Sequence, residues 1–220
     1  MTHKSISDKV KIKSKKKRTH SSRVWLERQL NDPFVRQAQV DGYRSRASYK
    51  MKEMAERFKL FHGANVIVDL GAAPGGWLQV AKKIKPKSFI VGVDLQEYED
   101  VPGTIKIIGD VTDAQTIDVL NAKLEGKKVD VVLSDMAAAA CGIASVDHDR
   151  IMLLLEITLN FGLEHLNKGG HLVGKVLRGG TEDKLLKRLK LHFKNVKHFK
   201  PESSRKGSAE MYVVATEFKG

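Results

Sequence analysis

A glycine-rich turn between an apolar run and a helical pattern constrains this chain more than any other feature. The apolar run covers residues 65–70, and the turn holds Gly71, Gly75 and Gly76. Such a turn after a buried strand opens a nucleotide-binding α/β sheet, because glycine lets the backbone approach a ligand closely. The same turn also occurs in α/β proteins that bind nothing, since one fold hosts many functions. The turn alone therefore leaves ligand binding open.

The spacing within the turn narrows the class of ligand. Its Gly-x-x-x-Gly-Gly pattern differs from the Gly-x-Gly-x-x-Gly of dinucleotide-binding proteins, and it lacks the Gly-Lys-Ser/Thr of a phosphate loop. An acidic residue, Asp69, precedes it. A wide turn of this kind suits a ligand that carries an amino acid and a cation but no pyrophosphate. S-adenosylmethionine fits that description.

The rest of the chain alternates strand patterns and helix patterns. Strands are predicted at 65–70, 88–94, 104–108, 129–134, 170–177, 194–200 and 209–217, and helices between them at 76–85, 113–124, 147–167 and 181–192. This alternation predicts a parallel sheet with helices on both faces. The link 201–208 is too short for a parallel crossover, so the last two strands should pair antiparallel. The predicted fold is the α/β, Rossmann-like fold of class I methyltransferases, with a mostly parallel seven-stranded sheet and a terminal antiparallel hairpin.

The positive charge of the chain is large and unevenly distributed. Its 39 Lys and Arg exceed 26 Asp and Glu to give a net charge of +13, and residues 1–18 hold eight basic residues against Asp8 alone. Such an excess favours an anionic partner, with nucleic acid first and an acidic membrane surface second. We expect residues 1–21 to form a disordered basic arm that contacts phosphates without reading sequence.

The remaining residues, 22–220, have the length of a single domain. The chain shows neither a secretory signal nor the run of ~20 apolar residues that a membrane span requires. Its single cysteine, Cys141, excludes an internal disulfide and fits a reducing compartment, so a cytoplasmic location is expected. Because Cys141 follows an alanine run, it is expected to be a small buried residue. No metal site is expected.

The first part of this domain, residues 22–60, is predicted to be a helical RNA-binding extension. Asn31 or Asp32 can cap a first helix that starts at Pro33, and a second helix starts at Ser48. The stretch between them is basic and holds two tyrosines. Its arginines are expected to hold the RNA backbone, and one of its tyrosines is available to stack on a base. These residues are Arg44, Arg46, Tyr43 and Tyr49.

Aspartates follow three of the predicted strands. Asp94 could accept hydrogen bonds from ribose hydroxyls and Asp110 from an adenine amino group, while Asp135 follows the next strand. Each alone is more simply a helix cap or turn residue. Because ligands bind at the carboxyl ends of the strands in open α/β sheets, three aspartates at such ends should share one rim.

Lys175 lies in the middle of an apolar strand pattern. Lysine is almost never fully buried unless it is paired, although a lysine on an edge strand can extend its amine to solvent. A strand at this position should be central in the sheet. The ammonium group therefore needs partners, and Asp135 and Glu210 are the candidates.

Together these residues resemble the FtsJ-type (RlmE-type) ribosomal RNA 2′-O-methyltransferases, from about Ser22 to the C-terminus. The matching stretches are Gln37-Ala-Gln, Arg44-Ser-Arg-Ala, Asp69-Leu-Gly-Ala-Ala-Pro-Gly-Gly-Trp77, Ser134-Asp-Met-Ala137, Lys175-Val, Pro201-x-Ser-Ser-Arg205 and Ser208-x-Glu-x-Tyr212. The glycine motif is shared by many methyltransferases. The ordered set of four matches the family's catalytic tetrad and is far more specific: Lys50, Asp135, Lys175 and Glu210.

The resemblance implies both the cofactor and the substrate. The implied cofactor is S-adenosylmethionine, contacted by Gly75, Trp77, Asp94, Asp110 and Asp135. The implied substrate is a uridine in the A-loop of large-subunit rRNA, methylated within an assembled subunit by a monomeric enzyme. One stretch departs from the family: residues 137–142 read Ala-Ala-Ala-Ala-Cys-Gly where many members have Pro and Asn after Asp-Met-Ala. This departure bears on which nucleotide is methylated.

The sequence leaves two questions open. Lys175 could act as the base that takes the ribose proton, or it could orient the hydroxyl and stabilise the developing alkoxide. The substrate could also be transfer RNA or a messenger cap, since enzymes for both resemble this tetrad, or the chain could be a non-catalytic RNA-binding assembly factor. A compact chain without added domains favours rRNA, and a complete tetrad favours catalysis.

Overall fold

The computed structural model describes residues 23, 26–27, 29–138, 141–205 and 207–220. The predicted basic arm, residues 1–21, lies outside the described residues. The helices are α2 (Pro33–Val40), α3 (Ala47–Phe58), α4 (Gly76–Ile84), α5 (Ala114–Leu124), α6 (Ala144–His165) and α7 (Asp183–His192). The strands are β1 (Val66–Leu70), β2 (Phe89–Asp94), β3 (Ile105–Ile108), β4 (Val129–Ser134), β5 (Leu166–Leu177), β6 (Phe193–Phe199) and β7 (Glu210–Phe218).

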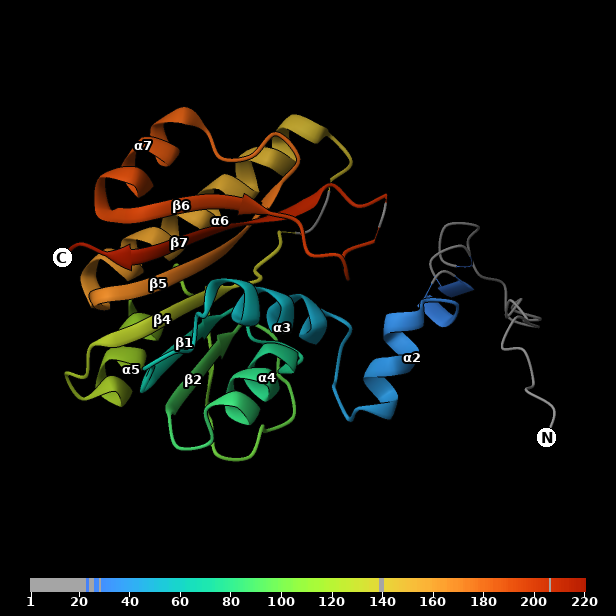
Figure 1. Cartoon of the computed structure of the whole chain (residues 1–220), viewed down its shortest axis with the longest axis horizontal. Coiled ribbons are helices and arrows are strands. Elements are labelled where there is room, and N and C mark those ends of the chain that lie inside the picture. The colour runs from blue at the N-terminus through green and yellow to red at the C-terminus, as the bar shows by residue number, and fades with distance from the viewer. Residues whose placement is uncertain (1–22, 24–25, 28, 139–140, 206) are drawn as a thin grey trace.

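All seven strands form one sheet, in the order β3-β2-β1-β4-β5-β7-β6, and Figure 1 shows the strands from β2 to β6 side by side. The first five strands are parallel, and β7 runs antiparallel to both of its neighbours. This confirms the predicted mostly parallel seven-stranded sheet and its terminal antiparallel hairpin. It also confirms that the strand carrying Lys175 is an interior one, since β5 lies between β4 and β7.

Helices cover both faces of the sheet, so the sheet separates two hydrophobic cores. Every residue of β1 is buried, as expected for a parallel strand that is covered on both sides. Val68 and its same-face neighbours pack against residues of α5, α6 and α7. Ile67 and its same-face neighbours pack against residues of α3 and α4. The second face is also the one on which Lys50 of α3 meets the sheet.

The cap of α2 agrees with expectation, whereas one helix boundary and the burial of one residue differ from it. Asp32, one of the two predicted caps, caps α2, and its side chain accepts a hydrogen bond from Phe34 N. The helix predicted at 147–167 spans Ala144–His165, because Leu166 already pairs with Val129 across a bulge in β5. Cys141 is exposed, so the expectation of a buried residue was wrong. It lies in the loop before α6, where its backbone N–H is held by Asp147.

None of the helices in the described part of the chain combines the length and the apolar character that crossing a lipid bilayer requires.

Candidate active site

The glycine turn follows β1 directly and is held closely against neighbouring strands. The backbone N–H groups of Gly71 and Ala72 donate to Val93 O at 2.8 and 3.1 Å. Gly71 has φ +84°, and a Cβ at this position would lie 2.5 Å from Met136 Cγ and 3.0 Å from Met136 N. Glycine is therefore required here both by backbone conformation and by space.

A cleft of about 440 Å³ opens beside this turn at the carboxyl ends of the strands. The three strand-end aspartates predicted to share a rim all line it, together with apolar side chains. The residues are Gly71, Ala73, Val93, Asp94, Leu95, Gln96, Gly109, Asp110, Val111, Thr112, Asp135, Met136, Ala137, Ala138 and Leu154. The cleft therefore combines carboxylates with an apolar wall.

Two of these carboxylates also shape the loops around the cleft. Asp94 accepts hydrogen bonds from Ala73 N and Gln96 N, each at 2.8 Å. Asp110 accepts from the backbone N–H and the hydroxyl of Thr112 with one oxygen, Oδ1. These bonds lower the pKa of the Asp110 carboxyl. Asp110 is therefore a carboxylate acceptor at neutral pH.

Gly75 and Trp77 lie behind this cleft and do not line it. The Trp77 indole is 2% exposed and donates to Ala47 O at 3.0 Å. Gly75, with φ +99°, precedes the first residue of α4. The Gly75 N–H donates to Ala72 O at 2.6 Å, so of these two residues it is Trp77, in the first turn of α4, whose backbone N–H is left for a ligand.

Ser45 is a candidate ligand-binding residue that the sequence reasoning missed. Its hydroxyl is buried and has no hydrogen-bond partner among the described residues. It lies beside Gly76, where an added Cβ would come within 2.6 Å of Ser45 Oγ. Gly76 is the first residue of α4, and the first N–H groups of a helix have no partner within that helix. Ser45 and this helix end together offer donors to an anionic group.

The four residues of the predicted tetrad come from four elements and lie together. Lys50 projects from α3, Asp135 follows β4, Lys175 lies on β5 and Glu210 begins β7. Lys175 Nζ lies 2.8 Å from Asp135 Oδ1 and 2.6 Å from Asp135 O. Lys50 forms an ion pair with Glu210. The tetrad is thus two lysine–carboxylate pairs.

Tyr212 joins these two pairs and was not given a role by the sequence reasoning. It lies opposite Lys175 in the β5–β7 register and is completely buried. Its hydroxyl is 2.8 Å from Asp135 Oδ1, 3.0 Å from Glu210 Oε1 and 3.3 Å from Lys50 Nζ. Burial, and then the charges of Asp135 and Glu210, raise the pKa of this hydroxyl. Tyr212 therefore stays protonated and donates to one of the two carboxylates at a time.

Asp69, the acidic residue before the turn, is buried beneath the cleft. It is 1% exposed, and neither of its carboxyl oxygens has a hydrogen-bond partner among the described residues. Burial, and then the charges of Asp135 and Asp94, raise the pKa of its carboxyl well above the usual value. The folded protein therefore favours the neutral acid at this position.

This environment predicts a pH-dependent effect of Asp69→Asn. Between the unfolded-state pKa near ~3.9 and the raised folded-state pKa, the native protein binds more protons than the unfolded chain. The stability of the unsubstituted protein therefore falls as pH rises through that window, by up to about 1.4 kcal/mol per pH unit from this group. We expect the free energy of unfolding of Asp69→Asn, minus that of the unsubstituted protein, to increase with pH. Denaturant unfolding between pH 4.5 and 7.5, with exposed Asp118→Asn as the control, measures this difference, and a constant difference would contradict the assignment.

Both arginines expected to hold RNA are bonded within the protein instead. Arg44 donates to the carbonyl oxygens of Pro74, Glu99 and Asp100. Arg46 donates to Ser203 O and lies 3.2 Å from Asp32 Oδ2. Their guanidinium groups fasten the helical extension to the rest of the domain, and their assignment to the RNA backbone stays a prediction.

The tyrosines of the same stretch are similarly engaged. Tyr43 is 8% exposed and contacts the edge of the Tyr49 ring, so it is not available to stack on a base. The Tyr49 hydroxyl donates to Asp41 Oδ2 at 2.6 Å. The Tyr49 ring also contacts Phe34. These rings stabilise the corner between α2 and α3.

A second group of contacts connects the helical extension with the loop between β6 and β7. Glu53 accepts from Glu202 N and Ser203 N at 2.6 and 2.9 Å. Arg205 donates to Asp32 Oδ2 at 3.0 Å. Because this loop leads into Glu210, the extension fixes the position of one tetrad member and supplies another, Lys50.

Within the described residues, no group of three or more His, Cys, Asp and Glu side chains has the arrangement needed to hold a metal ion.

Comparison with known proteins places this geometry among RNA-modifying enzymes. Residues 43–218 match the model of the FtsJ-like methyltransferase family. Ribosomal RNA large subunit methyltransferase E of Erythrobacter litoralis is 51% identical over 210 residues, covering 96% of this chain and 95% of the relative. The protein of the same name from Rickettsia bellii is 48% identical, covering 94% and 93%. A crystal structure from Plasmodium falciparum, described as a ribosomal RNA methyltransferase, is 28% identical with a TM-score of 0.71 and covers 81% of this chain and all of that one.

Proposed function

The chain belongs to the FtsJ-like methyltransferase family, and we propose that it uses S-adenosylmethionine to methylate a ribose 2′-hydroxyl in large-subunit ribosomal RNA. It aligns over 96% of its length, at 51% identity, with two large-subunit rRNA methyltransferases, and it is therefore a ribosomal RNA methyltransferase. The observation that carries the proposal is the joined pair of lysine–carboxylate contacts, Lys175–Asp135 and Lys50–Glu210, beside a cleft lined by carboxylates.

The residues around the cleft fit S-adenosylmethionine. Ser45, buried without a partner, and the start of α4 do not line the cleft itself, but α4 begins just beyond Ala73, which does, and their donors suit the carboxylate of its methionine part. Asp94 suits the ribose hydroxyls and Asp110 the adenine amino group, because both are carboxylate acceptors on the cleft wall. Gly71 keeps the turn free of a side chain that the cleft could not hold. Bound there, S-adenosylmethionine supplies an electrophilic methyl group.

The tetrad would prepare the ribose hydroxyl for attack. A hydroxyl is a weak nucleophile, so it must be aligned with the methyl group and must lose its proton. Lys175 is held by two oxygens of Asp135, which fixes its ammonium group at the floor of the site. Tyr212 and Lys50 extend the network to Glu210 and keep these charges paired. In this arrangement Lys175 orients the hydroxyl and stabilises the developing oxyanion while the hydroxyl proton passes to solvent water.

We propose finer details of the substrate from the family resemblance. The target is a uridine of the A-loop, presented within an assembled large subunit to a monomeric enzyme in the cytoplasm. The basic arm, residues 1–21, adds phosphate contacts without sequence preference. The alternatives of transfer RNA or a messenger cap are less well supported, because the relatives are named for the large ribosomal subunit.

Mass spectrometry of ribosomal RNA fragments tests the proposed reaction. Cells without this chain should lack one ribose methyl group in large-subunit rRNA, and the unsubstituted gene should restore it while Lys175→Ala should not. A methyl group lost from transfer RNA instead would contradict the substrate. An unchanged pattern of ribose methylation in all RNA would contradict the activity.

Asp94→Ala tests the proposed cofactor site. Losing an acceptor for the ribose hydroxyls should weaken S-adenosylmethionine binding by about 5- to 150-fold, equivalent to roughly 1–3 kcal/mol. The same change also frees Ala73 N and Gln96 N, which hold the wall of the cleft. Calorimetric titration measures the affinity, and exposed Asp118→Ala on α5 is the control. Unchanged affinity in Asp94→Ala would remove Asp94 from the site.

A further inference from the structure

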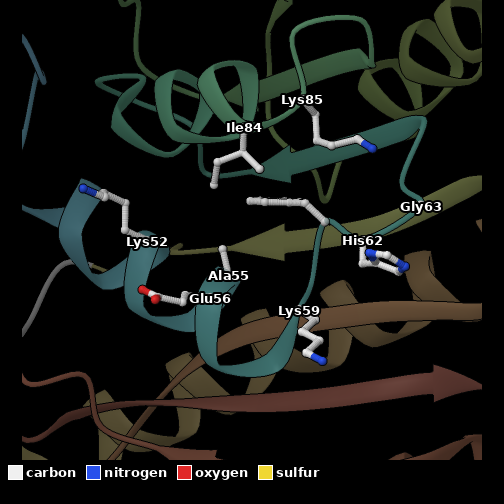
Figure 2. A pocket seen from close by; sticks show the side chains of 9 residues that line it. Lys52, Ala55, Glu56, Lys59, His62, Gly63, Ile84 and Lys85 are labelled. Carbon is white, nitrogen blue, oxygen red and sulfur yellow. The ribbon is translucent and has the colours of Figure 1, made fainter.

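A second cavity, of about 450 Å³, lies between the end of α3, the loop that follows it and the end of α4 (Figure 2). It is lined by Lys52, Ala55, Glu56, Lys59, Phe61, His62, Gly63, Ile84 and Lys85. None of these residues takes part in the cleft or the tetrad described above. Its volume is in the range of pockets that hold small organic groups.

This cavity, which we call the α3–α4 pocket, is at the opposite end of α3 from the tetrad. Lys50 lies in the first half of the helix, and Lys59 follows its last residue. Their separation of nine positions corresponds to about 13 Å along the axis of a helix. The loop after Lys59 leads into the first residue of β1, so the pocket lies toward the amino ends of the parallel strands. The tetrad lies at the carboxyl ends.

The floor of the α3–α4 pocket is apolar. Phe61 is 3% exposed and forms part of the core, whereas Ile84 is 47% exposed although it is a large hydrophobic residue. In Figure 2 the side chains of Ala55 and Ile84 point toward each other from α3 and α4. A flat apolar group could cover Ile84 and this floor.

The rim of the same pocket is basic. Three lysines and one histidine surround the floor, against a single acid, Glu56. The lysines are Lys52, Lys59 and Lys85, and Figure 2 shows them on three sides of the apolar centre. An apolar floor within a cationic rim matches a planar base carried on a phosphate backbone.

We propose that the α3–α4 pocket binds an unstacked nucleotide of the RNA, with its base against Ala55, Phe61 and Ile84 and the adjoining phosphates against Lys59 and Lys85. The inference rests on the proposed function, since it assigns a second contact to the same RNA substrate. It also supplies cations that are not engaged in the network of Arg44 and Arg46, both of which are bonded within the protein. A second copy of the chain fits the pocket poorly, since a symmetric contact would bring the lysines of both copies together.

The double substitution Lys59→Glu and Lys85→Glu tests the phosphate contacts in the full chain. Binding of a fluorescently labelled single-stranded uridine nonamer is followed by anisotropy over a series of salt concentrations. Loss of two phosphate contacts should lower the slope of log K against log salt by about 1.4 units. The control is Lys123→Glu with Lys187→Glu, which makes the same change in net charge from exposed positions on α5 and α7. A slope equal to that of the control would overturn the proposal.

Photo-crosslinking tests the position of the base. The same nonamer with 4-thiouridine should crosslink to a peptide that contains Phe61 or Ile84, and the double variant should lose that crosslink. Crosslinks confined to other parts of the chain would overturn the proposal. A change in oligomeric state of the double variant without a change in salt slope would also overturn it and assign the surface to a second copy.

Methylation of large subunits from cells that lack the chain separates this proposal from the proposed function. The double variant should raise KM for the subunit while kcat and the affinity for S-adenosylmethionine stay unchanged. Normal methylation with no change in KM, salt slope or crosslink would overturn the pocket alone. A different result would be that the unsubstituted chain methylates no rRNA while the double variant still lowers the salt slope and loses the crosslink. That result would support the pocket and contradict the proposed function.

Discussion

Lys175→Ala is expected to lose methyl transfer to rRNA while its affinity for S-adenosylmethionine stays nearly unchanged. The ammonium group is paired with Asp135 through two contacts and is opposite Tyr212 in the sheet, on the tetrad side of the site. It does not line the cleft proposed for the cofactor. Removing a group that orients or deprotonates the nucleophile should lower the single-turnover rate by at least about 10²-fold. Calorimetry of S-adenosylmethionine binding is the control for an intact fold.

Lys175→Arg distinguishes the two roles left open by the sequence. Arginine keeps the positive charge but cannot lose a proton near neutral pH. Lys175 Nζ contacts both Oδ1 and the backbone O of Asp135, which holds the amine in one position, as the proposed orienting role requires. We therefore expect Lys175→Arg to retain measurable single-turnover activity that Lys175→Ala lacks. If the single-turnover activity of Lys175→Arg is as low as that of Lys175→Ala, Lys175 acts as a general base. Full activity of Lys175→Ala would remove Lys175 from the mechanism.

Gly71→Ala is expected to destabilise the protein more than the same substitution does in an open turn. Its positive φ costs a residue with a side chain about 1–2 kcal/mol, and the new Cβ would meet the backbone and side chain of Met136. Such overpacking adds about 1–3 kcal/mol. Because Met136 follows Asp135, any shift that relieves the contact should also disturb the tetrad and lower activity.

Gly126→Ala is the matched control for this substitution. Gly126 has φ +74°, and an added Cβ would meet nothing within 4 Å. It therefore carries the conformational cost without the steric one. Denaturant unfolding should show Gly71→Ala to be less stable than Gly126→Ala by about 1–3 kcal/mol. Equal losses of stability would mean that the contact with Met136 is not important.

Much of this fold was predictable because its determinants are local. The alternation of apolar runs with helical patterns fixed the order of elements, and the short link before β7 fixed its antiparallel direction. The strand-end rule then brought Asp94, Asp110 and Asp135 to one cleft. The position of Lys175 in an interior strand followed from the same topology.

The parts that could not be predicted depend on contacts between distant segments. Arg44 and Arg46 looked free for RNA because their acceptors are backbone carbonyl oxygens, which no sequence pattern marks. Tyr212 was visible only as part of a matching stretch, and its role depends on the register of β5 and β7. Ser45 is a candidate for ligand binding because its buried hydroxyl has no partner among the described residues, and only the packing of the folded chain shows this.

The place of β7 in the sheet also has consequences for how the chain reaches its native state. β7 follows every other strand in the sequence, yet it lies between β5 and β6. Until it inserts, both of those strands have an unpaired edge, and exposed strand edges promote association between chains. Contacts between residues far apart in sequence form slowly, and Lys50 and Glu210 are 160 residues apart. Assembly of the tetrad should therefore coincide with the last step of folding, so a partly folded chain would be prone to aggregate but unable to methylate RNA.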